Sequence, residues 1–145
     1  MFFVDRNIIE KQLIFIEERI QLFEDESDWH SPLKQAALER IVHTTLEAIL
    51  DAANGIIDGF IMRDPGSYED IIDILEDEKV IEAELAVVLK KLIPFRNILV
   101  QEYTEINGEN LGNIWEKNLA FIKLFPKRVR IYLQTELGPV SAFRN

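Results

Sequence analysis

The sequence predicts an all-α fold, an antiparallel bundle of four to five main helices in a single domain that spans residues 1–145. Apolar residues recur at helical spacing in several long segments, and cap residues stand where these segments begin or end. No segment alternates apolar and polar residues with a period of two, as a half-buried strand would. A chain of this length can also bury an ordinary hydrophobic core.

The first expected helix begins after Asp5, a good N-cap residue, and ends near Asp25. A second expected helix begins at Pro32, which follows the cap residue Ser31 in the first helical position, and continues to about Ile61. The acidic stretch between the two helices is most simply a solvated connection. The apolar face of the first helix consists of Ile9, Leu13, Ile16, Ile20 and Phe23.

A third, short helix is expected from Ile71 to about Asp77, because Ser67 and Asp70 resemble a capping box that opens it. The segment after Glu82 is helical again. Pro94 lies inside this segment, and since proline has no backbone N–H it should kink or restart the helix just before Arg96.

The pair Asn107-Gly108 is expected to end that helix by supplying left-handed backbone positions. The last expected helix runs from about Asn110 to Leu137 and is bent at Pro126. It stops at Gly138-Pro139, because glycine fits a C-cap and proline cannot continue a helix.

Composition excludes several classes of site. The chain has no cysteine, which rules out disulfides, thiolate zinc sites, iron–sulfur clusters and cysteine nucleophiles. The two histidines, His30 and His43, have no carboxylate at a known metal-ligand spacing, so we expect no metal site. There is neither a glycine-rich phosphate loop nor a nucleophile elbow.

The net charge of −10 opposes strong non-specific binding of nucleic acid. Six basic residues nevertheless lie in residues 111–145, where they are either an RNA footprint or a complement to the dipole of the last helix, which we favour. An acidic residue, Asp5, interrupts the apolar N-terminus before it reaches the length of a signal peptide, and no run of about 18 residues lacks charge. We therefore expect a cytoplasmic protein without a membrane association.

The second expected helix carries a single narrow polar stripe on an otherwise apolar surface. Such a helix should be covered on two sides, and part of this cover is expected to come from a second copy in a symmetric homodimer. The stripe is either a solvated seam, in which Glu47 and Asp51 pair with Arg40 and His43, or a polar groove that receives functional side chains from another helix. Its members are Arg40, His43, Thr44, Glu47, Asp51, Asn54 and Asp58.

A second polar patch is expected near Arg96. Tyr103 lies seven residues further on and would share a helix face with Arg96, while Asn97 and Gln101 lie beside them. Arg96 is either an ion-pair partner for the acidic groups of the stripe, close to Asp51 or Asn54, or a phosphate ligand whose guanidinium offers a fork to two anionic oxygens. In the second interpretation Asn97 helps to bind the phosphate.

Over nearly its whole length the chain resembles the HepT-like toxin family of the HEPN superfamily, and above all a bacillus-type branch of it. The resemblance implies a HEPN-like bundle. Members are linked to metal-independent RNA cleavage at a dimer cleft, and their usual partner is a nucleotidyltransferase antitoxin that in some pairs transfers AMP to a tyrosine. The residues that carry the resemblance are 40–51, Asn54, Asp58, 65–70, 95–100, Tyr103 and Phe125-Pro126.

The family motif is an Arg, four residues, a His, one residue and a Tyr. Arg96 matches the Arg, and Tyr103 matches the Tyr, which is both a catalytic candidate and the modification target. Gln101 stands in the place of the His, and an amide cannot exchange a proton near neutral pH, so acid–base catalysis loses a contribution of about 10²–10⁴-fold. The resemblance thus implies a toxin-type ribonuclease weakened by Gln101. The alternative is a non-catalytic dimeric module that binds a nucleotide or a protein; neither requires a cofactor.

Overall fold

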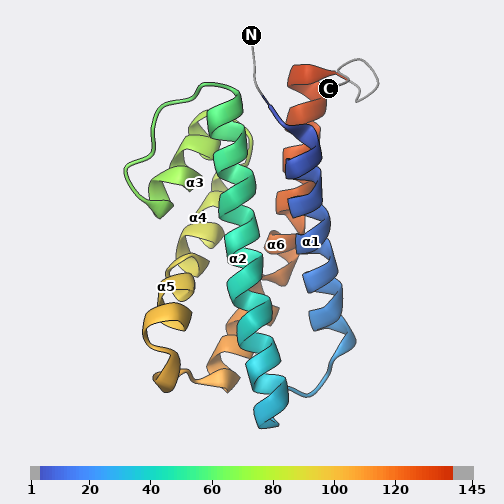
Figure 1. The fold of residues 1–145 in the computed structure, drawn as a ribbon, viewed down its shortest axis with the longest axis vertical. Coiled ribbons are helices and arrows are strands. Elements are labelled where there is room, and N and C mark those ends of the chain that lie inside the picture. Colours follow the sequence, from blue (N-terminus) through green and yellow to red (C-terminus); the bar gives the residue numbers. More distant parts are fainter. Residues whose placement is uncertain (1–3, 139–145) are drawn as a thin grey trace.

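In the computed structural model, which describes residues 4–138, the chain forms six α-helices and one short 3₁₀ turn (Figure 1). Since α4 and α5 are separated only by Ile93, whose backbone is itself helical, they act as one helix interrupted at Pro94, and the bundle has five main helices. The predicted all-α class is confirmed. The helices are α1 (Arg6–Asp25), α2 (Pro32–Gly59), α3 (Tyr68–Asp77), α4 (Ala83–Leu92), α5 (Pro94–Gln101) and α6 (Gly108–Leu137), with the 3₁₀ turn η1 (Tyr103–Glu105) before α6.

The first helices begin where the cap residues predict. The Asp5 carboxylate accepts a hydrogen bond from the backbone N–H of Ile8 at 3.1 Å. The Ser31 hydroxyl accepts one from the backbone N–H of Lys34 at 3.2 Å, so that α2 starts at Pro32. Each cap satisfies a backbone donor that has no partner within its helix. At its other end α2 stops two residues before the predicted Ile61, whose φ of 55° is outside the helical region.

The prediction for Asn107-Gly108 is wrong, because these residues begin α6 and do not end the helix before it. Asn107 has an extended backbone, and its side chain accepts a hydrogen bond from the backbone N–H of Asn110 at 3.0 Å. Asparagine serves equally as an N-cap, which is the role it takes here. The preceding helix ends at Gln101, and α6 runs from Gly108 across Pro126 to Leu137. Gly138 has a φ of 79° and ends the helix as expected, whereas Pro139 lies outside the described residues.

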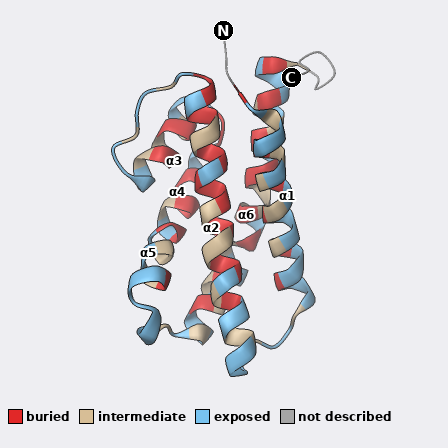
Figure 2. Cartoon of the chain, viewed as in Figure 1, coloured by how far each residue is buried: buried red, intermediate tan, exposed pale blue. Residues whose placement is uncertain are grey.

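The central helix of the bundle is α2 (Figure 1). It packs against α1 on one side, against α3 and α5 on the other, and against α6. The prediction of two covered sides is confirmed, and Figure 2 shows buried residues on several sides of this helix. Trp115 and Phe125 of α6 are among the largest fully buried side chains in the core. The covering helices come from the same chain, so the apolar faces of α2 do not form the intersubunit surface inferred from the sequence.

Ion pairs join α1 to α6 along the bundle. The Arg130 guanidinium donates hydrogen bonds to the carboxylates of Glu10 and Glu17, with shortest distances of 2.7 Å. Lys123 pairs with Glu24 at 2.6 Å. These basic side chains of α6 are therefore occupied by acidic groups of another helix, an arrangement that favours a structural role over an RNA footprint. None of the helices described is long and apolar enough to cross a membrane.

Candidate anion-binding site at the junction of α2, α3 and α5

Arg96 lies where three helices meet. Its Nε donates a hydrogen bond to Oε1 of Glu47 on α2. Its guanidinium carbon also lies 4.7 Å from the ring centroid of Tyr68, the first residue of α3, which is the geometry of a cation–π contact. The side chains of Arg96 and Glu47 are 25% and 32% exposed. The guanidinium is therefore held from two sides and still reached by solvent.

Pro94 explains how Arg96 comes to face α2. Since proline cannot donate a backbone hydrogen bond, the ladder of α4 ends with the N–H of Ile93 on Leu89, at 2.9 Å. The helix then restarts with a hydrogen bond across three residues instead of four, from the N–H of Arg96 to the carbonyl of Ile93, at 3.0 Å. The kink predicted at Pro94 is confirmed, and it falls two residues before the functional candidate.

The polar stripe of α2 is a groove in its middle and a solvated seam at its ends. Glu47 accepts the hydrogen bond from Arg96 on Oε1, and Nε2 of His43 lies 3.7 Å from the same oxygen. Arg40 and Asp58, near the two ends, are exposed. Thr44 and Asn54 are half-buried. Of the pairs predicted within the stripe, only that of Glu47 with His43 is found among residues 4–138.

The predicted position of Arg96 on the stripe is right, but its partner is Glu47, one helical turn before Asp51. Asp51 still interacts electrostatically with the Arg96 guanidinium. Burial raises the pKa of Asp51, the Glu47 carboxylate raises it further, and Arg96 acts in the opposite direction. The middle of the groove thus holds two carboxylates against one guanidinium, and its affinity for an anion depends on how fully Glu47 neutralises Arg96.

The single polar patch predicted on α5 is not formed. α5 ends at Gln101, and Tyr103 belongs to η1, so a spacing of seven residues does not place Tyr103 on the helix face of Arg96. Asn97, Gln101 and Tyr103 are exposed, Tyr103 by 68%. Within residues 4–138 their side chains make no hydrogen bond. Arg96 therefore faces α2, while the other three candidates remain available to a partner or ligand.

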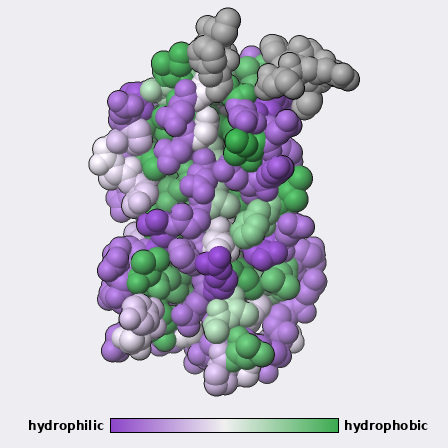
Figure 3. Space-filling view, viewed as in Figure 1, coloured by the Kyte–Doolittle hydropathy of each residue, from purple (hydrophilic) through white to green (hydrophobic). Residues whose placement is uncertain are grey.

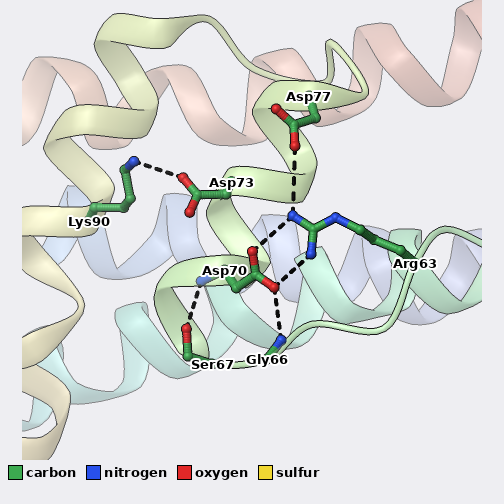
Figure 4. A network of polar contacts seen from close by, with 7 residues as sticks. All are labelled: Arg63, Gly66, Ser67, Asp70, Asp73, Asp77 and Lys90. Atoms are coloured by element: carbon green, nitrogen blue, oxygen red, sulfur yellow. Dashed lines mark hydrogen bonds and ion pairs between the residues drawn. The ribbon is translucent and has the colours of Figure 1, made fainter.

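Tyr68 is a site residue that sequence reasoning missed. Its position depends on the loop before α3, which is fastened by Asp70 (Figure 4). The Asp70 carboxylate accepts two hydrogen bonds from Arg63, at 2.7 and 2.8 Å, and one from the backbone N–H of Gly66, at 2.8 Å. The hydrogen bonds from Arg63 have the largest effect and the one from the Gly66 N–H the next largest, and together they lower the pKa of Asp70 to about 2. The capping pattern Ser67–Asp70 predicted this turn, but no sequence signal places its tyrosine on a distant arginine.

Two hollows flank the ion pair of Arg96 and Glu47. One, of about 270 Å³, is bounded by Tyr68, Pro94 and Asn97 together with Arg96. The other, of about 350 Å³, lies between α1 and α2 and is bounded in part by Glu47 and Asp51. Figure 3 shows that hydrophilic residues cover most of the face on which α2 lies, with separate hydrophobic patches, one of them over α5.

Removing the arginine should destabilise the fold through its partner. We expect Arg96→Ala to lower the free energy of unfolding by about 1–3 kcal/mol, between the effects typical of exposed and buried pairs, because it strands a half-buried carboxylate. Adding Glu47→Gln should recover at least about 0.5 kcal/mol. Urea denaturation of both single variants and the double variant measures this coupling, and strictly additive losses would contradict a shared site. Asp51→Asn in place of Glu47→Gln is the matched control and should recover less.

Comparisons with known proteins agree over nearly the whole chain. Residues 9–129 match the family described as Ribonuclease HepT-like. The chain is 51% identical over 144 residues to a Bacillus subtilis protein, "Putative RNase YutE". The match covers 99% of this chain and 100% of that protein. The solved structure of YutE, described as a cytosolic protein of unknown function, has a TM-score of 0.95 at 52% identity and covers 99% of this chain and 100% of its own.

More distant solved structures share the fold. A tri-AMPylated HEPN toxin of Shewanella oneidensis in complex with an MNT antitoxin has a TM-score of 0.75 at 24% identity. The match covers 86% of this chain and 97% of that one.

Proposed function

The chain belongs to the HepT-like ribonuclease family, and on that premise we propose that it binds single-stranded RNA at a cleft between two copies of the chain and cleaves it slowly, without a metal ion. Arg96 is the phosphate ligand in this proposal, with Asn97 beside it. Gln101 makes cleavage slow, and Tyr103 assists or accepts a modification.

The proposal rests on how the Arg96 guanidinium is held: its Nε and one face are occupied, and its terminal nitrogens donate no hydrogen bond within residues 4–138. Glu47 occupies the Nε, and the ring of Tyr68 occupies the face. A planar guanidinium held in this way presents two parallel N–H groups to two oxygens of a phosphodiester, and little side-chain entropy is lost when it binds. A cation that served only as an ion-pair partner would not need this second support.

Gln101 limits the chemistry. Cleavage of RNA by its own 2′-hydroxyl requires a group that takes the hydroxyl proton and a group that gives a proton to the leaving oxygen. The exposed amide of Gln101 does neither near neutral pH, whereas the imidazole of the family motif does both. The same residue favours a second candidate function, a non-catalytic dimeric module that binds a nucleotide or a protein. The absence of any metal-free cleavage by wild-type protein would select the second.

A partner protein is part of the proposal. Tyr103 is 68% exposed, as a residue modified by another enzyme must be. The Shewanella toxin that shares this fold is AMPylated and bound to an antitoxin. We propose a nucleotidyltransferase antitoxin as the partner of this chain, with AMP transferred to Tyr103, and a cytoplasmic location for both.

The chain is expected to be a homodimer in solution. The buried faces of α2 do not supply the interface, but three helices each expose a large apolar side chain, Leu33 near the start of α2, Val100 on α5 and Ile131 on α6. A cleft built from two copies needs apolar contacts to hold them together. Light scattering at micromolar concentration should give twice the chain mass of 16.9 kDa. A monomer mass would remove the dimer cleft from the proposal.

RNA binding tests the proposed function directly. Fluorescein-labelled single-stranded RNA should bind the wild-type protein, and Arg96→Ala should weaken the binding by about tenfold or more and reduce its salt dependence. Arg128→Ala is the matched control, because Arg128 has a similar exposure of 34% and also pairs with a single carboxylate, Glu82. Fluorescence anisotropy measures both. Equal losses in the two variants would show that overall charge acts and not a site, and the proposal would fail.

A further inference from the structure

The hollow beside Arg96 has the size of a subsite and not of a whole ligand. Its volume of about 270 Å³ lies just below the range of roughly 300–1,000 Å³ that is typical of pockets for drug-sized molecules. It lies between the first residue of α3, Tyr68, and the kink at Pro94. A single flat aromatic group, of one or two fused rings, is the kind of group that such a hollow accommodates.

The charges around the hollow favour a neutral occupant. Arg96 bounds it, and Glu47 pairs with the Nε of this guanidinium from the α2 side. Glu69 bounds the hollow as well, and its carboxylate repels an anion. A phosphate inside the hollow would therefore meet two carboxylates, Glu47 and Glu69, and one guanidinium. A neutral ring that stacks and accepts polar contacts at its edge suffers no such repulsion.

The side chains around the hollow suit a nucleobase. Tyr68 is 50% exposed although the Arg96 guanidinium lies over its ring. Tyrosine and arginine planes are both common stacking partners for unpaired bases. Asn97 is exposed at the same hollow, and its side-chain amide offers both donors and an acceptor to the edge of a base.

The geometry points to a base-binding subsite at Tyr68, in which one base of a single-stranded RNA stacks against Tyr68 while Asn97 contacts its edge. This inference rests on the proposed function, because the bound base belongs to the nucleotide whose phosphate is bound by the terminal nitrogens of Arg96. A stacked base matters for this chain because its net charge of −10 opposes binding through phosphates alone. Base stacking contributes affinity that does not depend on counterion release.

The test compares two probes that carry the same number of phosphates, a short labelled oligoadenylate and an abasic oligomer with the same backbone. The full-length wild-type protein should bind the oligoadenylate about tenfold or more tightly than the abasic oligomer, and this ratio should persist when the salt concentration rises. Tyr68→Leu should bring the ratio to within about twofold, because it should weaken binding of the oligoadenylate far more than binding of the abasic oligomer. Tyr68→Phe, which keeps the ring, should retain the wild-type ratio.

Other outcomes separate the subsite from the proposed function. If wild-type protein binds both probes equally and Arg96→Ala weakens both, the proposed function stands and the subsite is wrong. If Tyr68→Leu weakens both probes to the same extent, Tyr68 only positions Arg96, and the subsite is again wrong. If neither probe binds the wild-type protein, both proposals fail. The wild-type comparison decides the matter even if Tyr68→Leu does not fold.

Discussion

Replacing Gln101 by His is expected to raise metal-free RNA cleavage by about 10²–10⁴-fold, the usual contribution of a general acid or base. Gln101 is the last residue of α5 and is exposed, so an imidazole fits there without displacing packed neighbours. The measurement is the rate of cleavage of a labelled single-stranded RNA in the presence of a chelator, from pH 5 to pH 8. An imidazole should add a pH dependence near its ordinary pKa that the wild-type protein lacks.

Gln101→Asn is the matched control, because it keeps the amide and should leave the rate unchanged. Rapid cleavage by the wild-type protein, lost in Arg96→Ala, would contradict the assignment of slow chemistry to Gln101. The proton transfer would then be assigned to His43, whose Nε2 lies 3.7 Å from the Glu47 oxygen that binds Arg96. His43→Gln would then abolish activity.

Arg96→Ala in the Gln101→His background should lower kcat by about 10²–10³-fold, the typical effect of removing a donor that stabilises charge in the transition state. Arg96→Lys should restore only part of the loss, since a single ammonium group cannot bind two phosphate oxygens as a fork. Separate measurement of kcat and KM shows whether Arg96 acts in the transition state or only in binding.

The Arg128→Ala control in the same background should keep both constants, because Arg128 pairs with Glu82 at the far end of α4 from Arg96. Circular dichroism and urea denaturation establish that each variant is folded at the assay temperature. If Arg96→Ala raises KM and leaves kcat unchanged, Arg96 acts in RNA binding and not in the chemical step.

Local signals predicted most of the fold. Asp5, Ser31 and Pro32 mark helix starts because a cap satisfies the first backbone donors, a requirement met within a few residues of chain. Asn107-Gly108 was misread for the same reason, since an asparagine beside a glycine suits both the end of one helix and the start of the next. In the fold the Asn107 side chain caps α6, and a Cβ at Gly108 would lie 2.8 Å from Cδ of Gln35 on α2.

The site was predicted less completely. Helical periodicity placed Glu47 and Asp51 on one stripe and pointed Arg96 toward it, but these two acidic residues are one turn apart. Which of them Arg96 meets depends on the axial offset between α2 and α5, and that offset is set by packing between segments 49 residues apart. Tyr68 was missed because its contact with Arg96 arises from the path of a loop. The periodicity of a single helix contains neither quantity.

The pairing of α1 with α6 has a consequence for the order in which the chain is made. Glu10 and its partner Arg130 are 120 residues apart, so at about 5–20 residues per second the ribosome needs roughly 6–24 s to supply the second after the first. α1 and α2 can pack as a hairpin during this interval, but the surface of α1 that α6 covers still faces water. The nascent chain therefore passes through a stage in which its first helix is complete and its bundle is open, and this is when it is most exposed to aggregation and to chaperones.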